Sequence, residues 1–280
     1  MLKCGRHTFD LRRPLVMGIV NVTPDSFHAA SRHPGHAGAL AQARQMAADG
    51  ADIVDIGGES TRPGATPVAT DEEIARVVPL TAELAGDGIT VSVDTMKPAV
   101  MRAVLAAGAA MINDVRALQE QGALEALAGS DAAVCLMHMQ GEPGSMQAAP
   151  TYADVVAEVR AFLAARAAAC VAAGIARERI VIDPGFGFGK TLAHNLALAH
   201  ALPEFAQMGY PVLAGLSRKS SLGAITGRDV AERLPASLAA MLATVTRGAS
   251  IVRVHDVRAT VDALKVWRAI DSGAWPDPAG

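Results

Sequence analysis

Apolar segments of strand length alternate with longer amphipathic segments along most of the chain. Almost every apolar segment ends on a polar residue and is followed by turn-forming residues, as strands that run into turns are. This pattern predicts eight strands, over Leu15 to Val22, Asp52 to Ile56, Ile89 to Asp94, Met111 to Val115, Ala133 to Met137, Arg179 to Ile182, Pro211 to Gly215 and Ser250 to His255.

Helical periodicity is present between these strands. It predicts helices from Asp71, from Pro98, and over Gly38 to Ala48, Ala123 to Ala128, Tyr152 to Ala173, Ala231 to Arg247 and Ala259 to Ile270. Thr70 and Glu73 have the spacing of a capping box, so we expect Thr70 to be the N-cap of the second helix. Pro98 fits the first turn of the third helix, where a missing N–H has no cost.

Strand-then-helix units with nearly continuous apolar strands are typical of a parallel sheet covered by helices. We therefore predict an α/β fold, a (β/α)8 TIM barrel with its active site at the C-terminal ends of the strands. No linker or repeat interrupts the pattern, so residues 1–280 are expected to form a single domain with a short polar lead-in at 1–14. The longest irregular segments, Thr23 to Gly38 and Glu59 to Thr70, follow the first two strands, where mobile catalytic loops are expected.

Composition narrows the class of protein further. The net charge of -3 gives no basic surface for nucleic acid. The cysteines, Cys4, Cys135 and Cys170, lie far apart without a C-x-x-C, which favours a reducing compartment. The N-terminal residues do not lead into a signal sequence, and no apolar stretch has the length that spans a membrane. We expect a cytoplasmic protein that acts on small molecules, with no nucleic-acid or membrane partner.

The segment from Asp183 to Thr191 ends a β-branched strand on a carboxylate and continues into alternating glycines. A phosphate-binding P-loop is excluded because Pro184 stands where its first Gly is needed, and the dinucleotide fingerprint needs its third Gly one residue later. The glycines allow the backbone to approach a flat or crowded group. A zinc site at His28, His33 and His36 is disfavoured because these residues lack ligand spacing.

Four strand ends carry a carboxylate or an amide, namely Asp55, Asp94, Asn113 and Asp183. In a barrel these side chains would meet in one mouth, where they could bind the N–H groups and ring nitrogens of a planar heterocycle. The alternative is helix N-capping, which Asp and Asn often perform where a strand meets a helix. For at least two of the four, ligand binding is about as well supported as capping.

Cationic residues lie on or after three of the predicted strands, the second, the seventh and the last. They are Arg62, Arg218, Lys219, Arg253 and His255. Arg253 and His255 are two residues apart on the last strand and therefore point the same way. The last two strands of TIM barrels commonly bind phosphate, and a guanidinium with an imidazole suits a multiply charged anion. Surface salt bridges are the alternative role for these cations. Their position at strand ends favours anion binding instead.

Several segments of the chain carry these residues in a recognisable order. They are Met17 to Phe27, Asp55 to Gly64, Asp183 to Phe188, Ser217 to Ser220 and Arg253 to Asp256. In order and spacing the chain resembles the dihydropteroate synthase family, and the similarity extends from Leu15 to Trp267. The family usually continues its first signature with Ser-Asp-Gly-Gly, and here the chain reads His28-Ala29-Ala30-Ser31-Arg32.

The resemblance implies an enzyme of folate biosynthesis, a sulfonamide target, that joins p-aminobenzoate to (7,8-dihydropterin-6-yl)methyl diphosphate and forms 7,8-dihydropteroate and pyrophosphate. The implied pterin-binding residues are Asp94, Asn113, Asp183, Lys219, Phe188, Gly215 and Met137. The implied diphosphate-binding residues are Asn21, Arg62, Arg253 and His255, with Asn21 also the ligand of Mg²⁺. The implied p-aminobenzoate-binding residues are Phe27, Thr61, Arg62, Pro63, Lys219 and Ser220.

The resemblance also implies a homodimer and a mechanism. Once Mg²⁺, Arg253 and His255 neutralise its charge, the diphosphate leaves; the pterin supports a methylene cation that Asp94 stabilises, and the arylamine attacks. The implied catalytic residues are Asp94, Lys219, Arg253 and His255. A pterin-dependent methyltransferase is disfavoured because methyl transfer needs no diphosphate-binding cations. A non-catalytic pterin-binding paralogue is the other alternative, and the altered segment 28–32 keeps it open.

Overall fold

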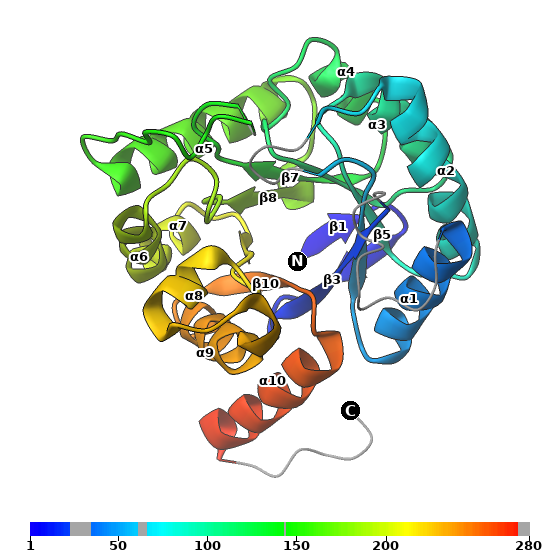
Figure 1. Cartoon of the computed structure of the whole chain (residues 1–280). Helices are drawn as coiled ribbons and strands as arrows, with labels where there is room; N and C mark the ends of the chain where they lie inside the picture. Colours follow the sequence, from blue (N-terminus) through cyan, green and yellow to red (C-terminus); the bar gives the residue numbers. More distant parts are fainter. Residues whose placement is uncertain (23–34, 61–65, 143, 274–280) are drawn as a thin grey trace.

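The computed structural model of the chain describes residues 1–22, 35–60, 66–142 and 144–273. It is a closed barrel of parallel strands ringed by helices, as Figure 1 shows along the barrel axis. Neighbouring strands follow chain order, and the last pairs with the first through Arg253 opposite Met17. The predicted TIM-barrel fold is therefore confirmed. The barrel strands are β3 (Leu15–Asn21), β4 (Ile53–Gly57), β5 (Val91–Asp94), β6 (Met111–Asp114), β7 (Ala133–Met137), β8 (Ile180–Asp183), β9 (Val212–Ala214) and β10 (Ala249–Val254).

Alternation along each strand divides the buried residues into two cores. One set points outward and packs under the helices, as Val16, Val93 and Val252 do. The other set points into the barrel, as Met17 and Ile251 do. Continuing the inward set to the C-terminal ends of the strands leads to the polar residues of the barrel mouth. They are Asn21 on β3, Asp94 on β5, Asn113 on β6, Asp183 on β8 and Arg253 on β10.

The helices pack on the outward-pointing side chains of the strands (Figure 1). They are α1 (His36–Ala48), α2 (Thr70–Gly86), α3 (Pro98–Ala106), α4 (Ala123–Ala128), α5 (Val155–Ala172), α6 (Leu192–His200), α7 (Leu202–Ala206), α8 (Ser220–Thr226), α9 (Leu234–Val245) and α10 (Val257–Ser272), with short 3-10 turns at η2 (Arg177–Arg179) and η3 (Val230–Glu232). The sequence pattern did not predict α6, α7 and α8, which are short, and it merged η3 with α9. Pro235 in the first turn of α9 separates the two, because proline is favoured at a helix start. Within the described ranges, no helix is both long and apolar enough to cross a membrane.

The predicted capping box at the start of α2 is wrong. Thr70 is the first residue of the helix, Ala69 is the N-cap, and no side chain caps it. The carboxylate of Glu73 instead accepts a hydrogen bond from Lys97 Nζ at 2.7 Å, which draws it away from the helix end. A capping box is present at α6, where the hydroxyl of Thr191 accepts from the backbone N–H of His194.

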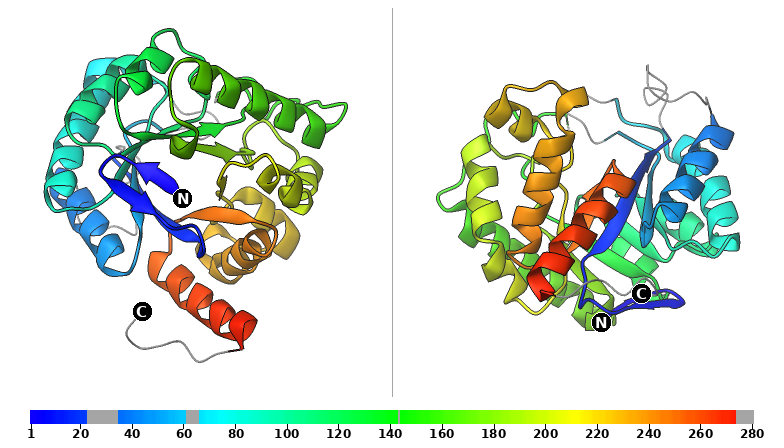
Figure 2. Two further views of the ribbon diagram at one scale, coloured as in Figure 1. Left: turned by 180° about the vertical axis from the view of Figure 1, so that it is seen from behind. Right: turned by 90° about the horizontal axis from the view of Figure 1, so that it is seen from below.

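The N-terminal residues, expected as a polar lead-in, form a two-stranded antiparallel hairpin of β1 (Leu2–Cys4) and β2 (His7–Phe9). The rear view in Figure 2 shows this hairpin across one end of the barrel. Leu2 and Cys4 are fully buried among the inward-pointing residues of the strands. The hairpin therefore closes the N-terminal end of the barrel, opposite the mouth.

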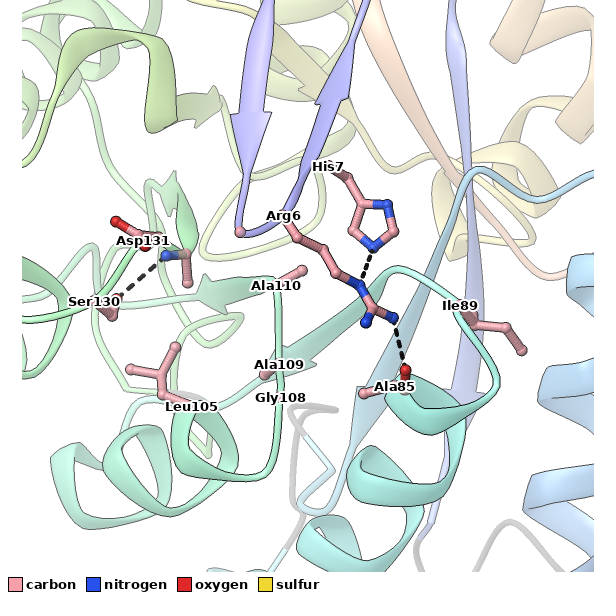
Figure 3. A pocket seen from close by; sticks show the side chains of 12 residues that line it. Arg6, His7, Ala85, Ile89, Leu105, Gly108, Ala109, Ala110, Ser130 and Asp131 are labelled. Carbon is pink, nitrogen blue, oxygen red and sulfur yellow. Dashed lines mark hydrogen bonds between the residues drawn. The ribbon is translucent and has the colours of Figure 1, made fainter.

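A cavity of about 290 Å³ lies beside this hairpin (Figure 3). It is lined by residues that precede β5, β6 and β7, such as Ile89, Ala109 and Asp131, and by the hairpin turn. Within it, Arg6 Nη2 donates to the carbonyl of Ala85 at 2.7 Å, and its Nε lies 3.2 Å from a ring nitrogen of His7. TIM-barrel chemistry occurs at the other end of the strands, so this cavity is not the active-site candidate.

Candidate active site

One guanidinium connects three strands across the barrel mouth. Arg253 on β10 donates from Nε to Asp55 Oδ2 on β4 at 2.6 Å and from Nη2 to Asp94 Oδ2 on β5 at 3.0 Å. Asn113 on β6 donates to the same oxygen of Asp55 at 3.1 Å. The structure therefore brings together the predicted residues Asp94, Asn113 and Arg253: Asp55 is the shared partner of Arg253 and Asn113, and Arg253 binds Asp94.

Burial and neighbouring charges shift the pKa values of Asp94 and Arg253 in this network. Burial raises the pKa of Asp94 to about 7, and the nearby Arg253 charge offsets only part of that effect. Burial alone would lower the pKa of Arg253, but the carboxylates of Asp55 and Asp94 outweigh it and raise that pKa. Asp94 can therefore change its charge near neutral pH.

A second group of residues lies on the β8 and β9 side of the mouth. Asp183 ends β8 and accepts a hydrogen bond from the backbone N–H of Gly185 at 2.7 Å. Lys219 donates to the carbonyl of Phe186, and its ammonium is 4.8 Å from the centre of the Phe188 ring. Burial raises the pKa of Asp183, and removal from solvent lowers the pKa of Lys219 to about 8 against the opposing effect of Asp183. This side offers a carboxylate, an ammonium and an aromatic face.

The turn after β9 separates two neighbouring cations. Arg218 has a φ of 57°, a left-handed conformation that is unusual for a residue other than glycine. Its guanidinium binds both oxygens of Asp256, at 2.8 and 2.6 Å. Arg218 is thus held in a salt bridge, as the alternative interpretation of the cations expected, while Lys219 faces the loop after β8.

The remaining predicted residues lie at strand ends around the same mouth. His255 follows β10 and places Nδ1 3.0 Å from the hydroxyl of Ser217. Asn21 ends β3 and is exposed, Met137 ends β7 and is buried, Gly215 follows β9, and Ser220 begins α8. The predicted residues Phe27, Thr61, Arg62 and Pro63, and the histidines His28 and His33, lie outside the described residues.

Polar atoms beneath the mouth have free hydrogen-bonding capacity. Within the part of the chain that the structure describes, Asp55 Oδ1, Ser92 Oγ and Asn113 Oδ1 are buried without a partner. They belong to inward-pointing residues of the adjacent strands β4, β5 and β6. Buried polar groups usually have partners, so a ligand or water that offers N–H or O–H groups suits this floor.

The glycines after Asp183 approach a neighbouring loop closely. Gly185 has a φ of 72°, and a Cβ there would lie 1.9 Å from the carbonyl oxygen of His138. A Cβ on Gly189 would lie 2.4 Å from the carbonyl oxygen of Gln140. These glycines do allow a close approach, and the crowded group is the backbone that follows β7; an approach to a ligand stays a prediction.

Sequence reasoning missed the roles of two residues in this region. Asp55 was grouped with the ligand-binding acids, but it is fully buried and contacts Asn113 and Arg253. Its inward position on β4, two residues before the strand end, is the signal that could have placed it beneath the mouth. Lys190 belongs to the segment that fails as a P-loop, yet it is 3 % exposed. A lone lysine after glycines carries no pattern that predicts burial.

A parallel barrel with acids, an amide and cations gathered at the C-terminal ends of its strands has the site placement of TIM-barrel enzymes. The chain belongs to the family described as pterin binding enzyme, whose sequence model matches residues 17–255. The predicted resemblance is therefore confirmed at the level of the family.

Individual relatives are named more specifically. The dihydropteroate synthase of Neisseria meningitidis serogroup B is 54% identical over 275 residues, which cover 96% of each chain. The structure of Burkholderia cenocepacia dihydropteroate synthase complexed with 7,8-dihydropteroate matches with a TM-score of 0.88 and 54% identity, covering 97% of this chain and 96% of that one. The Xanthomonas albilineans dihydropteroate synthase with 4-aminobenzoic acid matches with a TM-score of 0.88 and 53% identity, covering 95% of each chain.

Proposed function

We propose that this chain is a dihydropteroate synthase, which condenses p-aminobenzoate with (7,8-dihydropterin-6-yl)methyl diphosphate to give 7,8-dihydropteroate and pyrophosphate. The observation that carries this proposal is the network in which Arg253 binds Asp55 and Asp94 beside Asn113. It places hydrogen-bond acceptors for a pterin next to a cation for its diphosphate. The relatives named for this activity, and those solved with 4-aminobenzoic acid and with 7,8-dihydropteroate, support the same reaction.

The pterin is assigned to the floor and the β8 side of the mouth. Asp94, Asn113 and Asp183 would accept from the ring N–H groups, and Lys219 would donate to a ring acceptor. Met137, Gly215 and Phe188 would surround the ring with apolar and backbone surface. Free acceptors at Asn113 Oδ1 and Asp55 Oδ1 support a donor-rich ligand here.

The diphosphate is assigned to Arg253, His255, Asn21 and Arg62. When a pterin occupies Asp94, Arg253 would exchange that contact for the phosphates while Asp55 keeps the guanidinium in place. Departure of the diphosphate would leave a cation on the pterin methylene, and the ionised carboxylate of Asp94 would stabilise it. A positive charge beside Asp94 would also lower its pKa from about 7 and keep it ionised. Asp94, Lys219, Arg253 and His255 are therefore the proposed catalytic residues.

Mg²⁺ is the proposed cofactor, with Asn21 as its protein ligand. Among the described residues, no group of three or more His, Cys, Asp or Glu side chains could hold a metal ion. Mg²⁺ commonly takes one or two protein oxygens and completes its shell with substrate phosphates and water. The single amide of Asn21 at the end of β3 suits such a site, and the ion would supply charge neutralisation to the leaving diphosphate.

The p-aminobenzoate is assigned to the rim formed by Lys219, Ser220 and the segments after β3 and β4. Phe27, Thr61, Arg62 and Pro63 are its further proposed contacts. The backbone N–H groups at the start of α8, where Ser220 lies, would favour its carboxylate. The weakly basic arylamine could then attack the methylene cation without a strong general base.

A product assay tests the proposed function. Purified protein is incubated with the pterin diphosphate and p-aminobenzoate, with and without Mg²⁺, and dihydropteroate and pyrophosphate are measured. We expect both products in equal amounts, dependence on Mg²⁺, and a large loss in Asp94→Asn. Binding of the pterin without product would indicate a non-catalytic paralogue, and methyl transfer would indicate the methyltransferase alternative.

We also propose a homodimer, a cytoplasmic location and a single domain over residues 1–280. The support for the dimer is that three large apolar side chains, Leu196 on α6, Ile225 on α8 and Val230 on η3, are each about half exposed, and that α6 contacts α8. The support for a reducing compartment is that Cys4, Cys135 and Cys170 are free and buried. Light scattering of the purified protein measures the oligomeric state, and a monomeric mass would contradict the dimer.

A further inference from the structure

Lys190 stands in the glycine segment after β8 and has no part in the proposed reaction. Its side chain is 3 % exposed. The ammonium nitrogen lies 2.9 Å from the carbonyl oxygen of Phe188, 3.2 Å from that of His138 and 3.0 Å from Nδ1 of the His138 ring. Over the described residues, it forms no salt bridge with a carboxylate. A buried lysine of this kind needs a physical explanation.

The three contacts match the donors of an ammonium. Burial and the neighbouring Lys190 charge lower the pKa of His138 to about 3, so the imidazole is neutral and its Nδ1 can accept. An –NH3+ group has three N–H donors, and here it meets a ring nitrogen and two carbonyl oxygens. Burial lowers the pKa of Lys190 to about 7, with Asp183 opposing the shift and Lys219 adding to it. The ammonium form therefore has one acceptor for each of its three N–H donors, while burial disfavours its charge.

The contacts of Lys190 add to other links between the loop after β7 and the loop after β8, where Gln147 donates to the carbonyl of Gly187 and Tyr152 to that of Gly189. His138 N donates to Asp183 O at 3.1 Å, and this is where the pairing of β7 with β8 ends. Beyond it, Gly185 and Gly189 bring the two backbones together so closely that a Cβ would collide with a carbonyl oxygen. Carbonyl oxygens that converge in a buried place repel each other unless a donor lies between them. The Lys190 ammonium supplies that donor.

The same loop forms the aromatic wall of the pterin side. Phe188 contributes the carbonyl that Lys190 binds and the ring that faces the Lys219 ammonium at 4.8 Å. Lys219 also donates to the carbonyl of Phe186 in this loop. A shift of the backbone at Phe188 would therefore move both the ring and the support of Lys219.

We propose that Lys190 is a positioning residue for the pterin, whose ammonium ties the loop after β8 to the end of β7 and so fixes Phe188 and Lys219. This inference rests on the proposed function, because the affected side of the mouth is the one assigned to the pterin. Lys190 is not a phosphate ligand, since its donors are taken by buried acceptors.

Groups on the other sides of Lys190 do not replace this role. On α6, Asn195 Nδ2 lies 3.5 Å from the backbone oxygen of Lys190 and does not contact the amine. Tyr152 donates to the carbonyl of Gly189 at 2.8 Å and packs against the His138 ring. The charged groups that act on the amine through space are Asp183 and Lys219. Among these contacts of the described residues, the ammonium is thus the one cationic link between the two loops.

The test compares Lys190→Met with Lys265→Met, an exposed lysine on α10 that serves as the matched control. Binding of the 6-hydroxymethyl pterin alcohol is measured by calorimetry, and KM for p-aminobenzoate is measured at saturating pterin diphosphate. We expect Lys190→Met to weaken binding of the pterin alcohol by about tenfold or more, because hydrogen bonds to a charged group are lost. The KM for p-aminobenzoate should change less than about twofold, and Lys265→Met should match the wild type.

Two further measurements separate positioning from packing. A double-mutant cycle combines Lys190→Met with Phe188→Leu. The fold-loss of pterin affinity in the double variant should be smaller than the product of the two single fold-losses, because Lys190 acts through Phe188. The ratio of affinities between wild type and Lys190→Met should also shrink from pH 6 to pH 9, as the wild-type amine loses its charge. The Lys190 charge also acts on the pKa values of Asp183 and His138, so a change of the ratio with pH reports the loss of that charge together with its effect on these two neighbours.

Clear outcomes overturn the inference. Equal affinity of Lys190→Met and wild type for the pterin alcohol, or independent losses together with a ratio that does not vary with pH, would show that Lys190 only packs. If Lys190→Met folds poorly by circular dichroism, Lys190→Gln, which keeps one donor, is measured in the same way. Failure of the wild type to bind the alcohol would instead count against the proposed function.

Discussion

Asp55 is a buried carboxylate that needs Arg253 as its counter-charge. It is fully buried, and one of its oxygens accepts from both Arg253 and Asn113. A buried carboxylate without its cation is strongly unfavourable, whereas a neutral amide in the same place is not. Arg253 therefore has two roles, to neutralise Asp55 in the folded protein and to meet the anion of the substrate.

Removing Arg253 should reveal the first role. We expect Arg253→Ala to lower the free energy of unfolding by about 3–5 kcal/mol, because Asp55 is left buried and unpaired. The double variant Asp55→Asn/Arg253→Ala should recover a large part of that loss. Urea unfolding at pH 7 measures both. A double variant no more stable than Arg253→Ala would contradict the dependence of Asp55 on Arg253.

Asp183 should discriminate between the two substrates. Asp183→Asn replaces an acceptor by a donor, so a pterin N–H would face another N–H, and we expect a loss of about 1–3 kcal/mol in pterin binding. Calorimetry with the pterin and with p-aminobenzoate measures the two affinities. Asp131→Asn, exposed at the opposite end of the barrel, is the matched control. Equal losses for both ligands would place Asp183 outside the pterin site.

Much of the site could be predicted from residue type and from the alternation of inward and outward positions along each strand. Asp94, Asn113, Asp183 and Arg253 all lie at inward positions near strand ends, which the alternation of residues along each strand indicates from the sequence alone. Charge alone was a weaker guide, since Arg218 pairs with Asp256 instead of facing the mouth. Which of two adjacent cations enters a site depends on the turn between them, and sequence spacing does not specify that turn.

At the scale of elements, strands were easier to predict than helix ends or short pieces. Each barrel strand is a buried apolar run, and burial on both faces gives a strong signal. The hairpin of β1 and β2 was missed because three residues per strand are too few to show an alternation. The capping box at Thr70 failed because Glu73 finds Lys97, a partner distant in sequence. Local patterns cannot anticipate such tertiary competition.

The hairpin should stabilise the barrel without affecting its chemistry. Leu2 is fully buried in the inner core, so we expect Leu2→Ala to lower the unfolding free energy by about 2–5 kcal/mol. Its kcat should stay close to that of the wild type, because the mouth lies at the other end of the strands. Denaturant unfolding and the product assay measure the two effects. Val266→Ala, 60% exposed on α10, is the control, and a similar destabilisation there would show that burial does not explain the result.

For the whole molecule, the two ends of the barrel have different physical characters. The N-terminal end is filled by apolar side chains from the hairpin and the strands. The C-terminal end gathers Asp94 with a raised pKa and Lys190 and Lys219 with lowered pKa values, all caused first by burial. Such shifts mean that each charged form is less stable in the fold than in water. Stability that the mouth gives up has to come from the rest of the barrel.

Lys219 allows a direct test of the cost that a buried charge in the mouth has for the stability of the fold. Its pKa falls from 10.5 to about 8 in the fold, so the unfolded chain binds more protons between these pH values. The stability associated with the neutral amine is present above pH 10.5 and is lost as pH falls through about 8. Lys219→Met has no such titration, so its unfolding free energy relative to wild type should shift in favour of the variant as pH falls from about 10 to about 7. The Lys219 charge also acts on Asp183 and on Lys190, whose pKa is about 7, so the change between about pH 10 and about pH 8 is the part that reports Lys219 itself. Urea unfolding at these two pH values measures it, while the product assay should show lost activity. A difference that does not change with pH would mean that the Lys219 ammonium is well solvated and that its position in the mouth has no cost to the fold.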